Sequence, residues 1–257
     1  MNAAVRTTCP YCGVGCGVLA RSRGSKVEIV GDPLHPANAG RLCSKGAALG
    51  ETLGSEGRLL YPMLSGRRAA WDEALDAVAG GFGRIIREHG PDAVAFYVSG
   101  QLLTEDYYVA NKLMKGFIGS ANIDTNSRLC MSSAVAGHKR AFGADLVPGC
   151  YEDFELADLV VLVGSNGAWC HPILHQRILR AKERRPQMRV VVLDPRRTPT
   201  CERADLHVPL RAGSDVWLFN GLLAYLHWRG GADEKFVAAS TAGLDAETAI
   251  GRSGIAA

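Results

Sequence analysis

From residue 70 onward, the spacing of apolar positions alternates between a helical and a strand pattern. Over residues 71–89, six apolar side chains fall on one face of a predicted helix, which Gly90 and Pro91 then end. Those six are Trp71, Leu75, Val78, Phe82, Ile85 and Ile86. We therefore expect an amphipathic helix over these residues.

Short apolar runs separate this helix from further helical patterns. The expected strands are residues 93–98, 159–164, 188–194 and 206–210, and the expected further helices are residues 105–118, 171–185 and 214–228. Continuously apolar strands that alternate with helices predict a parallel sheet covered on both faces. Residues 159–194 have the length of one right-handed βαβ unit. The fold class is therefore α/β, with a Rossmann-like domain and a mostly parallel sheet.

The first sixty residues differ in composition from the rest of the chain. They are rich in glycine and cysteine, and only residues 27–30 predict a strand, before the turn-forming GDPLHPANAG. Such a loop-rich module needs a metal centre for stability. We predict a small N-terminal iron–sulfur module with short strands over residues 1–62, and the α/β region over residues 63–257. The tail from residue 240 shows no closing element, so we expect the α/β region to be truncated at its C-terminus.

Composition and charge exclude some classes of function. The net charge of the 257 residues is +3, without a basic run, which argues against nucleic acid as a partner. The longest apolar stretch, residues 159–163, is too short to cross a bilayer, so we expect no membrane association. The first cysteine is already residue 9, which leaves no room for an export signal and favours a cytoplasmic location.

Four of the eight cysteines lie in the N-terminal region of the sequence, namely Cys9, Cys12, Cys16 and Cys43. Four thiolates bind either zinc or an iron–sulfur cluster. Zinc ribbons usually use two Cys-x2-Cys knuckles, whereas CPYCGVGC crowds three sulfurs into one loop and takes the fourth from a distance. A cubane is large enough for such a loop to wrap three corners, and the interspersed glycines permit the tight turn. The spacing favours a cluster and leaves zinc as the alternative.

Five motifs in order carry a resemblance to a known family: CPYCGVGCG, GRLCSKG, NSRLCMSSAV, GSNGAWCHPIL and DPRRT. They resemble the front half of molybdopterin oxidoreductases, and more narrowly the catalytic subunits of bacterial assimilatory nitrate reductases. The resemblance covers most of residues 7–220. It implies a [4Fe-4S] cluster on the four front cysteines and a molybdenum bis(molybdopterin guanine dinucleotide) cofactor.

The resemblance also implies that Cys130 is the protein ligand to the molybdenum and the catalytic residue. A soft thiolate suits this metal. Residues 131–142 predict a helix of small side chains, which would place Cys130 at a junction between loop and helix. Backbone N–H groups at such a junction would stabilise its thiolate.

The remaining cofactor contacts implied by the resemblance are Lys45, Gln101, Asn126, Gly164, Ser165, Asn166, His171, Asp194, Arg196, Gly213 and Asp215. A strand, a GSN turn and a helix are the arrangement with which a doubly wound sheet binds phosphate, and an acidic residue after the next strand commonly holds a ribose. Asp215 is equally explained as a carboxylate that stabilises a helix N-terminus. His171 and His175, four residues apart, are a weaker zinc candidate, because no carboxylate is spaced to complete the site.

The reaction implied by the resemblance is oxygen-atom transfer from nitrate, which leaves as nitrite, for nitrate assimilation. Electrons would pass through the cluster from ferredoxin, flavodoxin or an NAD(P)H-dependent reductase subunit. One alternative is a formate dehydrogenase of the same superfamily, but in that group His typically follows the metal-binding residue, and here Met131 follows Cys130. Another alternative is a fragment that binds the cluster without catalysis, because the catalytic subunits of this family are much longer.

Overall fold

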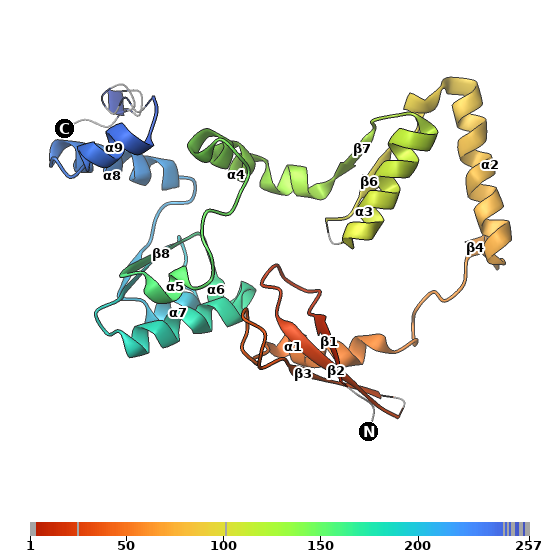
Figure 1. The fold of residues 1–257 in the computed structure, drawn as a ribbon, viewed down its shortest axis with the longest axis horizontal. Helices are drawn as coiled ribbons and strands as arrows, with labels where there is room; N and C mark the ends of the chain where they lie inside the picture. Colours follow the sequence, from red (N-terminus) through yellow and green to blue (C-terminus); the bar gives the residue numbers. More distant parts are fainter. Residues whose placement is uncertain are drawn as a thin grey trace. The chain divides into compact units, whose positions relative to one another are not determined.

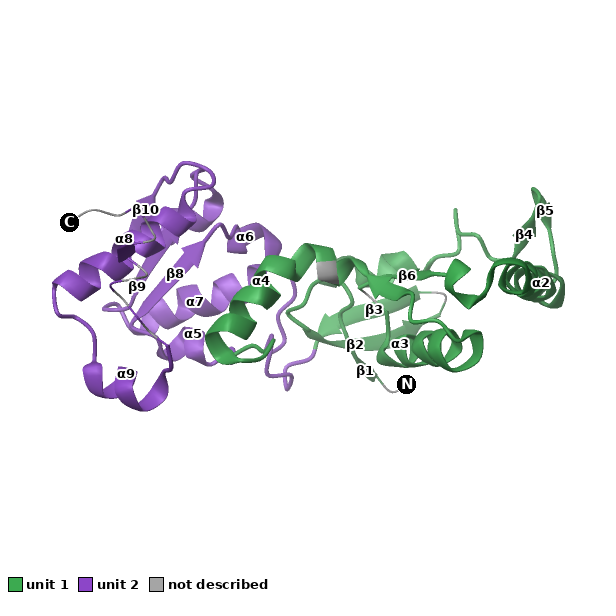
Figure 2. Ribbon diagram, turned by 90° about the horizontal axis from the view of Figure 1, so that it is seen from above, with its two compact units in different colours: residues 1–31, 44–149 green, residues 32–43, 150–257 purple. Residues whose placement is uncertain are grey.

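The computed structural model (Figure 1) describes residues 4–24, 26–100, 102–243, 245, 247, 250–251 and 254. The chain divides into two compact units (Figure 2), called unit 1 and unit 2. Unit 1 comprises residues 1–31 and 44–149, and unit 2 comprises residues 32–43 and 150–257. The predicted domain boundary after residue 62 stays a prediction.

Unit 1 begins with a three-stranded antiparallel sheet in the order β1-β2-β3. The strands are β1 (Val5–Thr8), β2 (Gly17–Arg23) and β3 (Lys26–Gly31). The prediction of a strand at residues 27–30 is confirmed, whereas β1 and β2 were missed. All four residues of β1 are exposed, so no alternation of apolar and polar positions marks this strand in the sequence.

The sheet packs closely on the helical turns that follow it in unit 1. The helix α1 (Ser44–Ala47) leads into the 3₁₀ helix η1 (Ala48–Leu53). A Cβ atom built on Gly50 in η1 would lie only 2.2 Å from the carbonyl oxygen of Val27 in β3. The absence of a side chain at Gly50 therefore permits the close approach of η1 to β3.

A short ribbon of β4 (Met63–Leu64) and β5 (Arg67–Arg68) precedes the predicted helix α2 (Trp71–His89). Acidic residues in its first turn and basic residues in its last turn suit the helix dipole. No residue of α2 is fully buried: Trp71 is 67% and Leu75 58% exposed, whereas Phe82, Ile85 and Ile86 on the same face are half-buried.

The rest of unit 1 contains a second, parallel strand pair. The strand β6 (Phe96–Val98) follows the 3₁₀ turn η2 (Pro91–Ala93) and pairs with β7 (Ile123–Thr125). The strand expected over residues 93–98 is therefore shorter, because β7 offers only three partner residues, and it is not fully buried. The helix expected at residues 105–118 is α3 (Thr104–Asn111), continued as the π-helix η3 (Lys112–Ile118). The last long helix is α4 (Asn126–Phe142).

Unit 2 contains a parallel sheet in the order β10-β9-β8, as the sequence predicted. Its strands are β8 (Leu159–Val163), β9 (Arg189–Leu193) and β10 (Leu206–Val208). Its helices are α5 (Asp153–Leu156), α6 (Gly167–Cys170), α7 (Pro172–Arg184), η4 (Pro199–Arg203), α8 (Asp215–Trp228) and α9 (Glu234–Ser240). The helices α7 and α8 confirm the predictions for residues 171–185 and 214–228. Leu193 of β9 pairs with both Val163 of β8 and Val208 of β10, so the three strands end at the same level.

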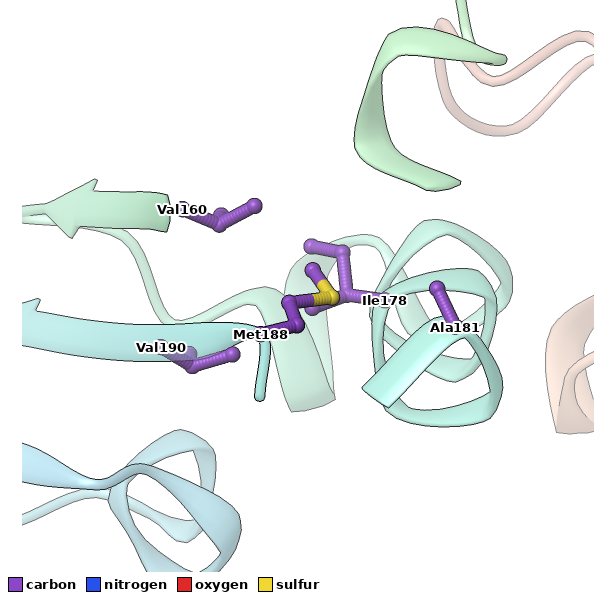
Figure 3. Packing of buried hydrophobic residues seen from close by; sticks show 5 residues of the cluster. All are labelled: Val160, Ile178, Ala181, Met188 and Val190. Atoms are coloured by element: carbon purple, nitrogen blue, oxygen red, sulfur yellow. The ribbon is translucent and has the colours of Figure 1, made fainter. Parts of the chain in front are cut away.

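The core of unit 2 lies between this sheet and α7 (Figure 3). Val160 of β8, Val190 of β9 and the preceding Met188 meet Ile178 and Ala181 of α7. Met188 is fully buried. Each large apolar side chain in such a core contributes about 1.5–3 kcal/mol to folding.

The opposite face of β8 differs from the expectation of a sheet covered on both sides. Leu159, Val161 and Val163 point away from the core and are 55%, 42% and 38% exposed. Strand side chains alternate between faces, and only the set that includes Val160 packs against α7. In the described part of the chain, no helix has the length and apolarity needed to cross a membrane.

An ion pair ties α7 to the start of β10. Lys182 Nζ donates to Asp205 Oδ2 at 2.6 Å, and the backbone N–H of Val190 donates to the same oxygen at 2.7 Å. Arg189 Nη1 donates to the other carboxylate oxygen at 3.2 Å. These hydrogen bonds, that of Lys182 first, lower the pKa of Asp205 to about 2. The carboxylate thus joins one helix and two strands.

The Gly50→Ala substitution should destabilise unit 1 by about 1–3 kcal/mol, because the new methyl group meets the backbone of β3. The measurement is urea unfolding followed by circular dichroism. Gly54→Ala is the control, since the nearest atom to its Cβ is 4.0 Å away, and it should change stability by less than about 0.5 kcal/mol. Equal stability of the two variants would contradict the described packing.

The Asp205→Asn substitution should lower the unfolding free energy by about 1–2 kcal/mol at pH 7, because charge-assisted hydrogen bonds are lost. The pKa of Asp205 is lower in the folded chain than its ordinary value of 3.8, so its stabilisation is present above about pH 4. The difference between wild type and variant should shrink as the pH falls from about 4 towards 2. Glu183→Gln, which breaks the exposed pair with Arg203, is the control and should have little effect. A difference that stays constant between pH 7 and pH 3 would refute this role of Asp205.

Candidate functional site

The loop between β1 and β2 holds three of the predicted cluster cysteines. The backbone N–H of Cys9 donates to the carbonyl oxygen of Cys16 at 2.8 Å, so the hairpin pairing continues beyond the strands. Gly15 has a φ of +68°, and its N–H donates to the carbonyl of Cys12 at 3.4 Å. Cys9 and Cys16 are buried and Cys12 is half-buried. The hairpin therefore carries three sulfur donors in one tight turn that a positive-φ glycine permits.

The fourth predicted ligand, Cys43, is half-buried and ends the segment of residues 32–43 in unit 2. All eight cysteines belong to the described residues, and none forms a disulfide. Within the described ranges, no three His, Cys, Asp or Glu side chains are placed to hold a single metal ion. A set of four thiols, three of them in one hairpin turn, fits the ligation of an iron–sulfur cluster. Assignment of the four ligands stays a prediction.

The structure places Cys130 inside helix α4, whereas the sequence predicted a position just before a helix. The helix α4 begins at Asn126, because the Thr125 hydroxyl caps it and accepts from the N–H of Ser127 at 3.5 Å. Cys130 is thus exposed in the second turn and not at the junction of loop and helix. The unpaired N–H groups of a helix belong to its first turn, so the expected stabilisation of a thiolate by them is wrong. The predicted role of Cys130 as a metal ligand now rests on the motif alone.

Two predicted cofactor regions meet at the carboxyl ends of β6 and β7. The N–H of Gly100 donates to Asn126 Oδ1 at 2.6 Å, and a Cβ on Gly100 would lie 2.6 Å from Ser127 Oγ. The segment after β6 and the first residues of α4 are therefore in close contact. The predicted contact Gln101 lies outside the described residues. Lys45 is exposed on α1, two positions after Cys43 in the chain.

In unit 2, the predicted nucleotide contacts follow the ends of three neighbouring strands. Gly164, Ser165 and Asn166 follow β8; Asp194 and Arg196 follow β9; and Gly213 and Asp215 come after β10. Because these strands are parallel and end at the same level, their connecting loops start from one edge of the sheet. Ligands of open α/β sheets bind outside this edge. The arrangement fits a phosphate-containing cofactor.

The loop after β8 is held by a buried hydroxyl. Thr200, 1% exposed, donates through Oγ1 to Asn166 Oδ1 at 2.9 Å, and Thr200 Oγ1 also accepts from the N–H of Ala168 at 3.1 Å. Gly164 has a φ of +56°, and its N–H donates to the carbonyl of Leu193 in β9 at 2.8 Å. These hydrogen bonds fix the backbone of the turn. Nothing in the pattern of TPTC marked Thr200, because its contact lies 34 residues away in the sequence.

A small pocket of about 90 Å³ adjoins this loop. Ser165 and His171 line it beside His175 of α7 and the apolar side chain of Leu162. Burial lowers the pKa of His175, which favours its neutral form. The pocket places two predicted cofactor contacts beside apolar surface.

Asp194 is buried at the end of β9, and one oxygen of its carboxylate accepts from the N–H of Arg196 at 2.8 Å. His207 Nε2 lies 2.9 Å from the carbonyl oxygen of Asp194. Both contacts order the turn after β9, while the side chain of Arg196 is exposed. Asp215 is the first residue of α8, which agrees with either of its two explanations. Gly213, just before it, has a φ of +82°.

Two family models match the chain. Residues 3–55 match the Molybdopterin oxidoreductase Fe4S4 domain, and residues 58–244 match Molybdopterin oxidoreductase. The Fe4S4 model spans all four front cysteines, and the second model includes Cys130 and the strand ends of unit 2.

Curated relatives extend this similarity. The chain is 65% identical over 232 residues to a nitrate reductase of Klebsiella oxytoca, which is 90% of this chain and 27% of the relative. It is 52% identical over 253 residues to a nitrate reductase of Shewanella frigidimarina, which is 95% of this chain and 27% of the relative. An F420-dependent formate dehydrogenase subunit of Methanococcus maripaludis is more distant, at 34% identity over 94% of this chain and 36% of the relative. The chain thus spans about a quarter to a third of the length of these relatives.

Among solved structures, the acetylene hydratase of Pelobacter acetylenicus shares the fold. The two superpose with a TM-score of 0.81 at 24% identity, over 96% of this chain and 35% of the other. This likeness confirms the predicted α/β fold class.

The Thr200→Val substitution should loosen the loop after β8, because Asn166 Oδ1 and the N–H of Ala168 lose their shared partner. Unpaired buried polar groups cost about 1–3 kcal/mol, so bound molybdenum per chain should fall roughly five-fold or more in the natural full-length protein. Metal analysis of the purified protein measures this loss.

Two matched variants control the experiment. Thr200→Ser keeps the hydroxyl and should retain the metal. Thr198→Val removes another buried hydroxyl, one that lies 4.0 Å from Cys201 Sγ and does not contact Asn166, and it should also retain the metal. Equal molybdenum content in all three variants would contradict the role of Thr200.

Proposed function

The chain belongs to the molybdopterin oxidoreductase family, and we propose that it is part of a molybdenum-dependent nitrate reductase that reduces nitrate to nitrite for assimilation. The observation that carries the proposal is the identity of 65% and 52% with two relatives named nitrate reductase, each over at least 90% of this chain. Formate oxidation is less favoured, because the formate dehydrogenase relative is only 34% identical and Met131 follows Cys130.

The iron–sulfur cluster is assigned to Cys9, Cys12, Cys16 and Cys43. The all-thiol donor set and the match to an Fe4S4 domain support this assignment. The hairpin would hold three corners of the cluster by itself, and the segment before Cys43 would supply the fourth. Lys45, exposed beside Cys43, is assigned as the cation between cluster and pterin.

The cofactor is proposed to be the guanine dinucleotide form of molybdopterin, with Cys130 as the protein ligand to the metal. The loops at the strand ends of unit 2 support the dinucleotide form. Ser165 and Asn166 would present backbone N–H groups to phosphate, and the positive-φ turn at Gly164 would let the phosphate approach the backbone closely. Asp194 would accept from a ribose hydroxyl, and Arg196 would meet phosphate or guanine. Asn126, His171, Gly213 and Asp215 are the remaining proposed contacts.

When bound, the molybdenum centre supplies the oxygen-atom transfer from nitrate, and the cluster relays single electrons to it. The chain would contribute binding and orientation through the loops already described. The electron donor is proposed to be ferredoxin, flavodoxin or an NAD(P)H-dependent reductase subunit, and the location to be cytoplasmic. Cell fractionation and activity with each purified donor test these two points.

The natural full-length protein should form nitrite from nitrate with a reduced dye as donor and should not oxidise formate. Cys130→Ser should lower the turnover by more than the roughly 10–100-fold loss typical of changes around a metal ligand. Cys150→Ser, which changes another exposed thiol, should leave turnover unchanged. Formate oxidation without nitrite formation would overturn the proposal.

The 257-residue chain alone should bind the cluster but show little turnover, because it spans 27% of each nitrate reductase relative. Nitrite formation by this chain, compared with the full-length protein at equal concentration, is the measurement. A comparable rate in the two would contradict this expectation.

A further inference from the structure

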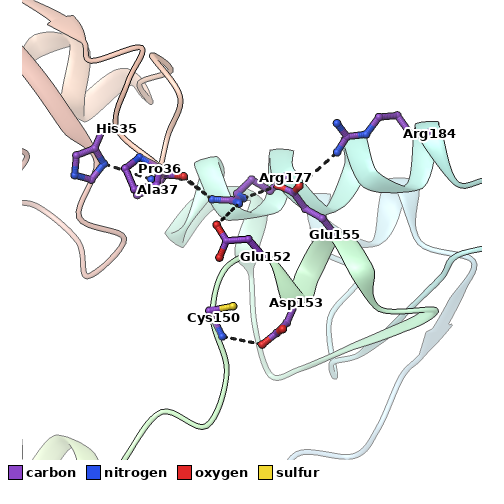
Figure 4. Close-up of polar contacts among 9 residues, drawn as sticks. All are labelled: His35, Pro36, Ala37, Cys150, Glu152, Asp153, Glu155, Arg177 and Arg184. Carbon is purple, nitrogen blue, oxygen red and sulfur yellow. Dashed lines mark hydrogen bonds and ion pairs between the residues drawn. The ribbon is translucent and has the colours of Figure 1, made fainter.

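Arg177, in the middle of α7, extends its guanidinium in three directions (Figure 4). Its side chain is only 12% exposed. Nε donates to Glu155 Oε1 at 2.9 Å, and Nη2 lies 3.5 Å from Glu152 Oε1. Nη1 donates to the carbonyl oxygens of Pro36 and Ala37, at 2.8 and 3.3 Å. One side chain thus joins α5 and α7 to a segment 140 residues earlier in the chain.

That segment, residues 32–43, is an internally bonded loop. The carbonyl oxygen of Asp32 accepts from the N–H groups of His35 and Gly40, at 3.2 and 2.9 Å, and the N–H of Ala39 donates to the carbonyl of His35 at 2.9 Å. Asp32 is 4% exposed. These hydrogen bonds connect both ends of the loop, so a contact at Pro36 constrains the rest of it.

Further hydrogen bonds connect the residues that Arg177 contacts with the residues just before Cys43. Asn38, 3% exposed, follows Ala37 directly, and its Nδ2 donates to the carbonyl oxygen of Arg41 at 2.7 Å. Arg41 N–H in turn donates to the carbonyl of Asn38 at 3.0 Å. Arg41 stands two residues before Cys43, so the position of Cys43 depends on the same loop that Arg177 holds.

The N-terminal end of α7 lies next to His171, one of the predicted cofactor contacts. The helix starts at Pro172, directly after His171, whose N–H donates to the carbonyl of Gly167, the first residue of α6, at 3.0 Å. A Cβ atom built on Gly167 would lie 3.8 Å from the Cβ atom of His175 in α7. The helix α7 therefore contacts the loop before Cys43 through Arg177 and also packs on α6, which follows the loop after β8.

We propose that Arg177 is a positioning residue that holds Cys43 in place for the cluster. It also ties this ligand to the α/β part of unit 2, where the predicted nucleotide contacts follow the ends of β8, β9 and β10. The proposal rests on the proposed cluster ligation by Cys43. Arginine suits the task because its planar fork offers donors in several fixed directions, whereas lysine is a point charge. Replacing Arg177 leaves two carbonyl oxygens and two carboxylates without their shared cation.

The test uses the anaerobically purified natural full-length protein in five forms: wild type, Arg177→Met, Arg177→Lys, Arg184→Met and Cys43→Ser. Arg184 is the matched control, because it pairs with the same Glu155 at 3.6 Å but is exposed. Three quantities are measured, none of which is catalytic activity. They are amide hydrogen exchange of residues 33–43 in metal-free protein, iron and acid-labile sulfide per chain, and the reduction potential of the cluster.

Arg177→Met should speed the exchange of residues 33–43 by roughly tenfold or more, since charge-assisted hydrogen bonds to the loop are lost. Its iron content should fall and the potential of any remaining cluster should shift. Arg177→Lys should lie between this variant and wild type, and Arg184→Met should match wild type. If circular dichroism shows that Arg177→Met does not fold, Arg177→Lys decides by the same three quantities.

Exchange in Arg177→Met equal to that in Arg184→Met would overturn the proposal. So would faster exchange with unchanged iron and potential, because Arg177 would then hold a loop without positioning a ligand. Cys43→Ser separates the premise from the inference. An unaltered cluster in Cys43→Ser refutes ligation by Cys43 and with it the proposal, whereas loss of the cluster in Cys43→Ser but not in Arg177→Met refutes only the role of Arg177.

Discussion

The parallel pairing of β8, β9 and β10 in one register is the constraint on which the predicted cofactor edge depends. Leu193 stands opposite both Val163 and Val208, so the chain leaves all three strands at the same level. The core of Met188, Ile178 and their neighbours holds α7 against two of these strands. Backbone hydrogen bonding and apolar packing thus bring together loops that are separated by up to fifty residues in the sequence.

Unit 2 also contains residues 32–43, although the chain before and after them belongs to unit 1. The contacts of Arg177 with Pro36 and Ala37 give a physical reason for this membership, because a nearly buried guanidinium is most stable with its donors paired. The three hairpin cysteines and Cys43 therefore come from different compact units.

Much of the fold follows from local pattern. The helices α2, α7 and α8 and the strands β8 and β9 have strong periodicity or continuous apolar runs, and the sequence predicted each within a few residues. The strands β1 and β2 lack such a signal. The start of α4 was misplaced because a single hydroxyl, that of Thr125, caps it earlier than the run of small residues suggested. The pattern also predicts which faces are apolar, but not that one face of β8 and the N-terminal half of the apolar face of α2 are exposed here.

The chemistry-bearing residues were predictable where a motif is contiguous, as in CPYCGVGC and GSN, and not where contacts are distant. Thr200 meets Asn166 across 34 residues, and Arg177 meets Pro36 across 141. In the sequence, Arg177 is one of several basic residues in HQRILRAKERR and looks like a solvated charge. Only the fold distinguishes it from its exposed neighbour Arg184.

The most direct test of the account is elemental analysis of the natural full-length protein, purified without oxygen. Iron, acid-labile sulfide, molybdenum and zinc per chain are measured together. We expect about four iron atoms with matching sulfide and about one molybdenum atom per chain, as one cubane and one mononuclear centre require. Zinc in place of both iron and molybdenum would contradict it.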